Sequence, residues 1–452
     1  MSERQRMRKI AVIGGGIAGL SAAWLLNRRH DVTLFERNAY IGGHSNTLDA
    51  PDGRGGSIPV DTGFIVYNER TYPNLIGLFD HLGVERIKTD MSFGVTLDRG
   101  RLEYGGSTLM SLFAQKRNLF RPRFHRMVRD ILRFYKEAPT ALSGGACAHM
   151  SLGAFLQAAG YSEAFVDDHL LPMAAAIWSC PVNTMKEFPA DSFVRFFDNH
   201  GLLQVNDRPQ WWTVKGGSRQ YVTRILQDLP RVETNAAIEA VTRDEAGVVL
   251  HFADGRQERF EEAVLACHGD EAHRMIGDPR PRERQILSAF RYQANRAILH
   301  TDARQMPKRR AVWSSWNYLA GRNADLEREV AVSYWMNNLQ SLDAQDLFVT
   351  LNPFTEIDPA RTIADLTYDH PVFDAETVTA QRALPEIQGR DRLWFCGSYC
   401  GYGFHEDGIG SAVAVCRRLG VEAPWDAKPV HAMHAVLGPA PDTGETAMES
   451  AA

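Results

Sequence analysis

The 452-residue sequence lacks the features of several specialised protein classes. No apolar run reaches the roughly 18–20 residues that span a bilayer, and no apolar segment precedes the first strand, so neither a membrane-spanning helix nor a secretory signal is expected. The net charge of −5 argues against a general nucleic-acid binder. No internal repeat is present. We therefore expect a cytoplasmic protein that binds no nucleic acid.

Cysteine is also scarce. The six cysteines are scattered and none forms a Cys-x-x-Cys pair, which indicates reduced, mostly buried thiols. Cys396 and Cys400 could suggest redox chemistry, but burial is the simpler interpretation. His431 and His434 supply too few ligands for a metal ion, and we expect no metal site.

The first forty residues contain what a dinucleotide-binding turn requires. Lys9–Ile13 is predicted to be a buried strand that runs directly into Gly14-Gly15-Gly16-Ile17-Ala18-Gly19 and a helix. Gly14 makes the tight turn, Gly16 lets the backbone approach a pyrophosphate, and Gly19 allows the helix to pack on the strand. The helix N-terminus favours the phosphate charge. Glu36 ends a second strand and is placed to accept hydrogen bonds from a ribose.

The rest of the chain changes pattern several times. Helical periodicity dominates residues 72–200, strands are predicted at 236–241, 248–252, 264–267, 294–301, 330–336 and 393–396, and helices at 220–229 and 410–419. The length favours two domains. The predicted fold class is α/β (α+β overall), with a discontinuous nucleotide-binding domain interrupted by a helical and mixed-sheet substrate domain. The predicted nucleotide-binding segments are 1–71, 205–285 and 386–420, the substrate-binding segments are 72–204 and 286–385, and 421–452 is a flexible C-terminal tail.

Several later motifs resemble those of the flavin amine oxidase superfamily, which includes carotenoid-type desaturases and protoporphyrinogen oxidase. They are Gly42-Gly43-His44, Pro59-Val60-Asp61-Thr62-Gly63-Phe64, Asn235-Ala236-Ala237-Ile238, and Phe395-Cys396-Gly397-Ser398 followed by Gly408-Ile409-Gly410-Ser411-Ala412. The resemblance covers the chain to about residue 420 and implies an amine-oxidase-like fold with FAD as cofactor. The cofactor contacts that it implies, together with the glycine turn, are Gly14, Gly16, Ile17, Ala18, Gly19, Glu36, Arg37, Gly43, His44, Thr62, Gly63, Phe64, Ala237, Gly397, Ser398, Phe404, His405 and Ile409.

The sequence departs from the superfamily pattern where amine chemistry would be done. His44 and Ser398 stand where the family usually has an arginine and an acid. Arg296 or Asn295 fills the position of the lysine beside flavin N5, and an arginine cannot act as a base at neutral pH. Tyr399, Tyr402, Phe404 and His405 are the side chains available for the usual aromatic cage. These departures make ordinary amine oxidation less expected.

Four longer phrases resemble a bacterial subgroup that is associated with cyclopropane-synthase-like methyltransferases and includes the desaturase of the furan fatty acid pathway. They are residues 60–68, 195–202, 312–318 and 401–408. The resemblance implies an FAD-dependent oxidoreductase that adds a double bond to a methylated, already unsaturated fatty acyl chain, free or in phospholipid. The alternatives are an amine, carotenoid or porphyrinogen oxidase, and a flavin protein without turnover in a lipid-modifying complex.

Removing two hydrogens from such a chain requires hydride transfer from an allylic carbon to flavin N5 and a base for the second proton. His405 is the predicted base because its ordinary pKa is near 6.5. Tyr402 would orient it, Glu406 or Asp407 would fix its tautomer, and Arg296 is the fourth predicted catalytic residue. The alternative is that 405–407 cap a helix.

Two further groups have open interpretations. Trp313, Trp316, Tyr334 and Trp335 would line an acyl tunnel or form plain core. Residues 116–136 hold eight cations and one acid, Asp130, interleaved with Phe120, Phe124, Phe134 and Tyr135. Such a segment can lie peripherally on an anionic membrane, or it can pack on the core with a solvated basic face.

Overall fold

The computed structural model describes residues 6–178, 182–204, 208–322 and 328–438, and the chain in it divides into two compact units. Unit 1 comprises Met1–Gly43, Ile225–Phe290 and Glu376–Ala452. Unit 2 comprises His44–Arg224 and Arg291–Ala375. The chain therefore passes from one unit to the other four times, and the first passage follows Gly43 rather than residue 71, where the sequence places a domain boundary.

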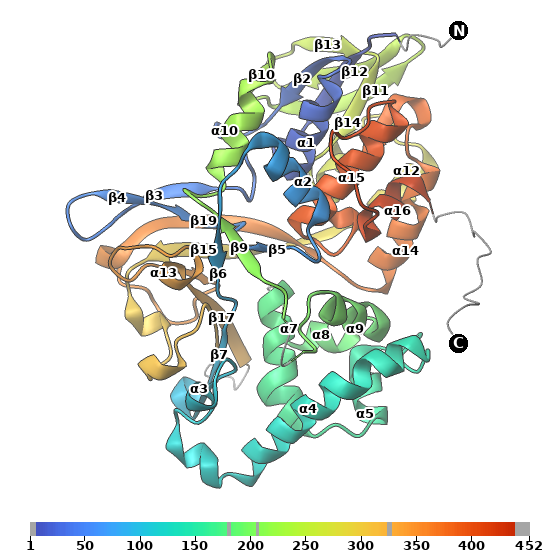
Figure 1. The fold of residues 1–452 in the computed structure, drawn as a ribbon. Coiled ribbons are helices and arrows are strands. Elements are labelled where there is room, and N and C mark those ends of the chain that lie inside the picture. The colour runs from blue at the N-terminus through green and yellow to red at the C-terminus, as the bar shows by residue number, and fades with distance from the viewer. Residues whose placement is uncertain (1–5, 179–181, 205–207, 323–327, 439–452) are drawn as a thin grey trace, which may run out of the picture. The chain divides into compact units, whose positions relative to one another are not determined.

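Unit 1 is built on a five-stranded sheet in which every neighbouring pair is parallel (Figure 1). The order is β10-β2-β1-β14-β20. These strands are β1 (Lys9–Ile13), β2 (Asp31–Phe35), β10 (Val232–Glu233), β14 (Glu262–Leu265) and β20 (Leu393–Phe395). The central strands are apolar because helices cover both faces of such a sheet. The predicted strands in the first forty residues and near 264 and 393 are confirmed.

Helices and a small antiparallel sheet complete unit 1. The helices are α1 (Ile17–Leu26), α11 (Gly269–Met275), α12 (Pro281–Leu287), α14 (Ala375–Ala383), α15 (His405–Arg418) and α16 (His431–Leu437). The sheet is β11 (Ile238–Asp244), β12 (Gly247–Phe252) and β13 (Gln257–Phe260). Helices α1 and α15 contact each other closely because Gly408 has no side chain: a Cβ there would lie 2.8 Å from Ile17 Cγ2.

The prediction of a flexible tail from residue 421 is wrong as far as residue 438. Helix α16 buries Ala432, Met433, Ala435 and Val436, and it packs on α15. The Trp425 ring stacks on Trp24 at a centroid distance of 6.3 Å. Seven residues are too few to show a helical period, so the sequence pattern could not reveal this element. Residues 439–452 and Cys180 lie outside the described ranges.

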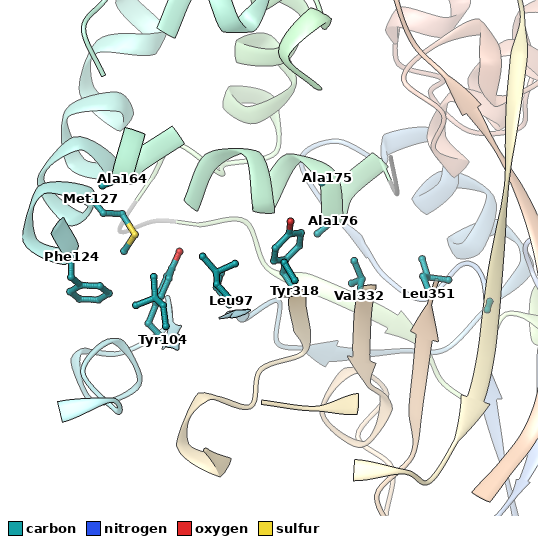
Figure 2. Close-up of a cluster of buried hydrophobic side chains, with 14 of the residues drawn as sticks. Leu97, Tyr104, Phe124, Met127, Ala164, Ala175, Ala176, Tyr318, Val332 and Leu351 are labelled. Atoms are coloured by element: carbon teal, nitrogen blue, oxygen red, sulfur yellow. The ribbon is translucent and has the colours of Figure 1, made fainter. Parts of the chain in front are cut away.

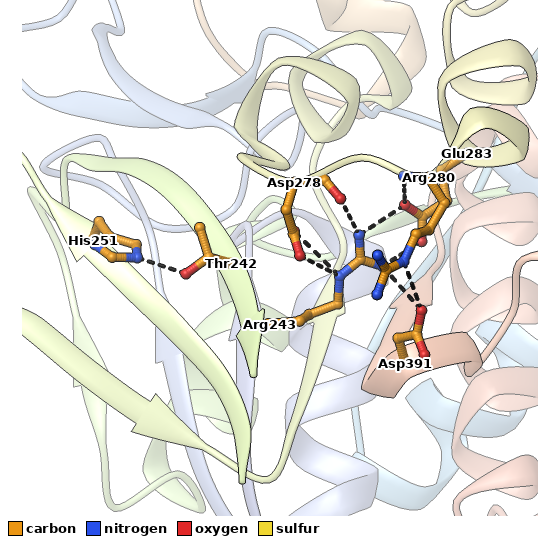
Figure 3. A network of polar contacts seen from close by, with 7 residues as sticks. All are labelled: Thr242, Arg243, His251, Asp278, Arg280, Glu283 and Asp391. Atoms are coloured by element: carbon orange, nitrogen blue, oxygen red, sulfur yellow. Dashed lines mark hydrogen bonds and ion pairs between the residues drawn. The ribbon is translucent and has the colours of Figure 1, made fainter. Parts of the chain in front are cut away.

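A buried ion-pair network joins β11 to the segment around α12 (Figure 3). The Arg243 side chain is 3% exposed, and its guanidinium donates to both carboxylate oxygens of Glu283, at 2.5 and 3.0 Å. It also donates to the carboxylate of Asp278 at 3.2 and 3.3 Å and to its carbonyl at 2.7 Å. A bidentate pair of this kind satisfies the buried charge and fixes the two elements together.

Unit 2 is built on a seven-stranded sheet of order β19-β15-β18-β17-β16-β7-β8, antiparallel except for the parallel pair β16–β7. Its strands are β19 (Thr362–Val372), β15 (Arg291–His300), β18 (Phe348–Leu351), β17 (Arg328–Trp335), β16 (Trp316–Arg322), β7 (Phe93–Leu97) and β8 (Leu102–Gly105). Two smaller sheets are β3 (Thr47–Pro51) with β4 (Ser57–Asp61), and β5 (Tyr67–Asn68), β9 (Trp211–Val214) and β6 (Arg86–Thr89).

The helical part of unit 2 falls mainly within residues 109–199, as predicted. Its elements are α3 (Leu109–Leu112), η2 (Lys116–Phe120), α4 (Pro122–Ser143), α5 (Leu152–Ala158), α6 (Glu163–Phe165), α7 (Leu171–Trp178), α8 (Val182–Glu187) and α9 (Ala190–Asn199). One turn of π-helix, η3 (Val166–Leu170), joins α6 to α7. An earlier helix, α2 (Pro73–Leu82), precedes β6. Strands β6, β7 and β8 fall inside the segment predicted to be helical, because strands this short give little periodic signal.

Candidate functional site

The glycine turn of unit 1 has the geometry that its sequence predicts. Gly14 has a φ of +111°, which favours glycine, and its N–H donates to Phe35 O at 2.8 Å. A Cβ on Gly19 would lie 1.8 Å from Gly14 O, so only glycine lets α1 pack against the turn. Helix α1 begins at Ile17 without a side-chain cap and without an acid in its first turn. Its first N–H groups therefore receive no side-chain acceptor of their own.

Gly16 provides a separate indication of a ligand. Its φ of −75° is ordinary for any residue, and a Cβ built on it would meet nothing within 4 Å. Neither the backbone nor a neighbouring side chain thus requires glycine at this position. The open space lies at the N-terminus of α1, where the positive end of the helix dipole favours a phosphate.

Glu36 lies at the end of β2, as predicted, and is 8% exposed. One carboxylate oxygen accepts the Gly15 N–H at 2.7 Å and the other accepts the Asn38 N–H at 2.9 Å. These bonds fix the side chain beside the glycine turn and leave lone pairs for a ribose hydroxyl. Arg37 is mostly exposed and pairs with Glu271 at 2.5 Å. Ala236 N donates to Glu36 O at 2.9 Å, which places the predicted contact Ala237 next to the same strand end.

The C-terminal motif forms a second glycine-rich turn in unit 1. Gly397 follows β20, and a Cβ there would lie 2.6 Å from the Tyr399 ring. Its N–H donates to Ser411 Oγ at 3.0 Å, which ties the turn to α15. Ser398 is partly exposed, whereas Ile409 is fully buried.

Helix α15 begins at His405, five residues earlier than predicted, and Asp407 caps it. The Asp407 carboxylate accepts the Phe404 N–H at 3.0 Å. Burial raises the pKa of Asp407 to about 7, although hydrogen bonds from the backbone N–H groups of Phe404, Tyr402 and Gly403 oppose the shift. Capping is therefore the structural role of Asp407. Glu406 is buried in the same first turn.

His405 differs from its predicted chemistry. Desolvation lowers the pKa of His405 to about 3, so its imidazole is neutral at any ordinary pH and is a weak base. Tyr402, which was predicted to orient His405, instead stacks on the ring of His431 of α16, with centroids 4.9 Å apart. The sequence could not predict this contact because it did not predict α16.

In unit 2, three of the predicted flavin contacts gather around Tyr368 of β19. The His44 ring lies 4.9 Å from the Tyr368 ring and 5.3 Å from that of His370. Thr62 Oγ1 lies 2.7 Å from the Tyr368 hydroxyl. A Cβ on Gly63 would lie 2.3 Å from His44 O, which explains the glycine there. Sequence reasoning missed Tyr368 and His370, since neither belongs to a recognisable motif.

Phe64, the fourth predicted contact in unit 2, is 8% exposed. Its ring stacks on Tyr67 and meets the edge of Tyr221, with centroids 6.3 and 6.5 Å away. Phe64 therefore belongs to an aromatic cluster with Tyr67 and Tyr221.

The structure assigns opposite positions to the two residues predicted for the lysine slot. Arg296 is exposed and pairs with Asp365 of β19 at 2.5 Å, which argues against the predicted catalytic role. Asn295 is completely buried, and its amide lies 3.2 Å from His370 Nδ1. Alternation along β15 explains the difference, because consecutive side chains point to opposite faces. The buried position carries a neutral amide, which cannot act as a base.

Asp61 at the end of β4 is a buried carboxylate with a full set of donors. It accepts hydrogen bonds from Thr47 Oγ1 at 2.6 Å, from the Ser218 N–H and hydroxyl at 2.8–3.1 Å, and from Gln340 Nε2 at 2.9 Å. Burial raises the pKa of Asp61 to about 6, although these hydrogen bonds oppose the shift. The group joins three segments of unit 2 and holds the Thr62–Phe64 segment that follows it.

One face of the seven-stranded sheet carries two buried apolar clusters. At one end it packs against helices α4 and α7, and at the other against β3, β4 and α13 (Met336–Leu339). Figure 2 shows Tyr318, Val332 and Leu351 standing on neighbouring strands below Ala175 and Ala176 of α7. Tyr334 contacts both ends. Tyr334 thus links the two clusters.

The four aromatic residues of the predicted tunnel divide between two places. Trp316 and Tyr334 belong to the apolar face, with rings 5.4 Å apart, and Trp316 Nε1 is buried without a hydrogen-bond partner. Trp313 and Trp335 pack edge to face beneath Arg310, and their indole N–H groups donate to Pro307 O and Asp346 Oδ1. These two tryptophans therefore do not belong to the apolar face.

Metal binding, cysteine redox chemistry and a membrane-spanning helix receive no support from the described ranges. No three His, Cys, Asp or Glu side chains gather there where they could hold a metal ion. The five cysteines among those residues are free thiols, and burial raises the pKa of Cys396 and of Cys400. No helix in the same part of the chain is long and apolar enough to cross a membrane.

Comparison with known proteins settles the family. Residues 17–337 match the profile described as flavin containing amine oxidoreductase. The chain belongs to this family. Members hold a flavin, and FAD is the cofactor of this chain.

Solved structures of the family fold are similar along nearly the whole chain. A CLA-producing fatty acid isomerase from P. acnes is 16% identical with a TM-score of 0.66, and the match covers 93% of this chain and 100% of that one. Cyclohexylamine oxidase from Brevibacterium oxydans is 16% identical with a TM-score of 0.65, covering 92% and 100%. At this identity the likeness shows the fold, and it confirms the predicted amine-oxidase-like α/β architecture.

Curated relatives match only short segments. A cinnamate reductase from Clostridium sporogenes is 38% identical over 53 residues, which are 12% of this chain and 8% of that protein. An uncharacterised protein of Acanthamoeba polyphaga mimivirus is 40% identical over 74 residues, 16% of this chain and 15% of its own. This chain thus spans a small part of the relatives' length, and their activities do not transfer with the match.

The residues of this flavin amine oxidoreductase fit FAD. The open space at Gly16 is a cradle that a Cβ would fill, and the uncapped N-terminus of α1 and the fixed carboxylate of Glu36 flank it. Gly14, Gly16, Ile17, Ala18, Gly19 and Glu36 would hold the pyrophosphate and ribose. The assignments of Arg37, Gly43, Ala237, Gly397, Ser398, Phe404, His405 and Ile409 in unit 1, and of His44, Thr62, Gly63 and Phe64 in unit 2, stay predictions.

Proposed function

We propose that this flavin-dependent oxidoreductase introduces a double bond into a fatty acyl chain that is methylated and already unsaturated. The observation that carries the proposal is the pair of apolar clusters on one face of the seven-stranded sheet in unit 2. A hydrocarbon substrate takes its binding energy from apolar burial, so an acyl chain would have to bind among side chains of this kind. One cluster includes the small side chains of Ala297 and Ala320 of the sheet and of Ala175 and Ala176 of α7.

The charges of unit 2 argue against an amine substrate. Each buried carboxylate in the described part of unit 2 is engaged by an arginine or by hydrogen-bond donors. The five are Asp61, Glu103, Asp130, Asp168 and Asp302. None of these five carboxylates is therefore left without a partner to pair with an ammonium group. The buried Asn295 likewise provides no base that would deprotonate an amine.

The fold and the sequence phrases support the same substrate class. A fatty acid isomerase is among the solved structures with this fold, so the fold is compatible with acyl substrates. The phrases at 60–68, 195–202, 312–318 and 401–408 resemble the furan fatty acid desaturase subgroup. A methylated substrate would be the product of a methyl-transfer reaction on an unsaturated acyl chain, which fits the predicted link to a cyclopropane-synthase-like methyltransferase.

Bound FAD would supply the two-electron oxidant for removing one hydrogen with its electron pair, and dioxygen or a quinone would be the final electron acceptor. The protein must exclude water and accept the second hydrogen as a proton. A proton next to an allylic cation is strongly acidic, so a weak base is sufficient. Neutral His405 meets this lower requirement, and we retain it as the proposed proton acceptor.

Lipid analysis of a host with and without the gene tests the proposal, with the Gly16→Ala variant as a flavin-binding control. A new double bond in methylated acyl chains, absent with the empty vector and diminished with the variant, is the expected result. Unchanged lipids, together with hydrogen peroxide release on amines, would overturn it. A protein whose flavin is reduced by neither substrate class would instead be a flavin protein without turnover.

A further inference from the structure

Exposed apolar side chains gather at one end of unit 2. Eight large hydrophobic side chains are exposed in the described ranges, and four of them fall between residues 109 and 120. They are Leu109, Met110, Leu119 and Phe120, with 76, 80, 47 and 86% of their surfaces exposed. We call these four side chains the apolar tip. Such a concentration of exposed apolar surface indicates a contact surface.

Hydrogen bonds fix the two segments, α3 and η2, that carry the side chains of the apolar tip. Gln115 and Asn118 are buried and donate to Gly100 O and Glu103 O, both at 3.1 Å, which fastens η2 to the segment around the edge strand β8. Leu119 and Phe120 follow directly and face solvent. Thr108 and Ser111 form a capping box at the start of α3. Leu109 and Met110 are the two residues between them, and both are exposed. The exposure is thus built into ordered structure.

Four cations without acidic partners lie close to the apolar tip in the sequence. Lys116, Arg117 and Arg126 are exposed and Arg121 is partly exposed, and no acid in the described ranges forms an ion pair with any of the four. Arg117 and Arg121 both donate to the backbone carbonyl of Arg101, which brings their two guanidinium groups together. Partial burial and the charges of Arg117 and Arg101 lower the pKa of Arg121.

The rest of the basic segment differs from the tip. Arg123 pairs with the buried Asp168, and Arg133 pairs with Glu137. Phe124 and Phe134, predicted to dip into a membrane, are buried in the protein. Helix α4 therefore packs on the core, and the alternative interpretation of a core-packed helix is right for it. Four of the exposed apolar side chains, and four cations without ion pairs in the described part of the chain, fall together within residues 109–126.

We propose that the apolar tip and its four cations dock on an anionic lipid surface. The cations match the lipid phosphates, while Met110, Leu119 and Phe120 reach into the boundary between headgroups and acyl chains. Nucleic acid would engage the cations but would leave the aliphatic side chains exposed to water. This docking goes beyond the proposed reaction, since it does not depend on which substrate the enzyme oxidises.

Sedimentation of the flavin-loaded protein with vesicles tests the docking. Binding to phosphatidylglycerol–phosphatidylcholine vesicles is expected to exceed binding to pure phosphatidylcholine and to weaken with salt. Lys116→Glu with Arg126→Glu should weaken anionic binding by at least about 25-fold, since losing each cation alone costs about fivefold. Phe120→Ser and Met110→Ser should each weaken it by on the order of tenfold.

Matched controls use other exposed positions. Leu132→Ser removes an exposed apolar side chain of α4, and Arg284→Glu with Arg382→Glu makes the same charge change in unit 1. Both should bind vesicles like the unmodified protein. Retained flavin absorbance and circular dichroism verify folding. Three outcomes would each overturn the proposal: equal binding to neutral vesicles, no binding of the unmodified protein to anionic vesicles, or tip variants that bind like the controls. None of these outcomes bears on the desaturation assay.

Discussion

Replacing Gly16 with alanine should separate cofactor binding from folding. The backbone at Gly16 has φ −75° and ψ −177°, and an added Cβ meets no atom within 4 Å. Because alanine fits this conformation, the substitution should stabilise the apoprotein by about 0.4–1 kcal/mol through the unfolded chain. FAD, by contrast, would lose its close approach to the backbone. Losing one charge-assisted hydrogen bond costs about 1.5–3 kcal/mol, so the Kd for FAD should rise about 10- to 150-fold.

Two other glycines provide the comparison. Alanine at Gly19 would place Cβ 1.8 Å from Gly14 O, so that variant should fail to fold normally. Alanine at Gly106 meets only Phe93 O at 3.6 Å, so it should leave both folding and FAD affinity almost unchanged. Fluorescence titration of each apoprotein with FAD gives the Kd, and thermal unfolding without FAD gives the stability.

The titration has a result that would refute the reasoning. If the Gly16→Ala protein is as stable as the unmodified protein and binds FAD equally tightly, the space at Gly16 is not the pyrophosphate cradle. A loss of stability instead would mean that glycine is required there by the fold.

Three further predictions concern buried charges. Glu283→Gln leaves the buried Arg243 short of a carboxylate and should lower the free energy of unfolding by about 3–5 kcal/mol in urea titrations; Arg259→Gln, which removes an exposed pair, should cost under about 1 kcal/mol and serves as its control. Since burial raises the pKa of Asp61 from 3.8 to about 6, the stability of unit 2 should fall by about 3 kcal/mol as pH rises from about 4 to about 6, and Asp61→Asn should flatten this pH dependence in thermal unfolding. His405→Ala should retain flavin absorbance and lose turnover. Since the pKa of His405 is lowered to about 3, no inflection near pH 6.5 in the rate profile of the unmodified protein should come from this residue. Full activity in the variant would show that His405 is not the proton acceptor.

The sequence was most informative where a backbone conformation demands glycine. Gly14 and Gly19 are required by the turn itself, and a strand, a helix and an acid follow at fixed distances, so the first forty residues predicted their own structure. The strand before Gly397 was also predicted from its own residues, a short apolar run that leads into a glycine-rich turn. Such local requirements are visible in a single sequence because they do not depend on distant residues.

The parts that the sequence could not predict depend on contacts between distant segments. Tyr368 and His370 join His44 and Thr62 across about 300 residues, and no local pattern marks them. Arg296 and Asn295 are neighbours, and a shift of one residue in the strand alignment decides which of them is buried. The pKa of His405 is set by its surroundings, so its ordinary value was a poor guide.

The order in which unit 1 receives its strands has a consequence for synthesis. Strand β2 is synthesised soon after β1, so these two strands can pair early. The other neighbour of β1 is β14, which begins only at residue 262. Strand β20, which pairs with β14, begins only at residue 393. During translation the edge of β1 stays open while all of His44–Arg224 emerges. An open, apolar strand edge is prone to aggregation, so the nascent chain needs protection until its last hundred residues appear. Any truncation before β20 should therefore yield an insoluble protein even though the glycine turn is intact.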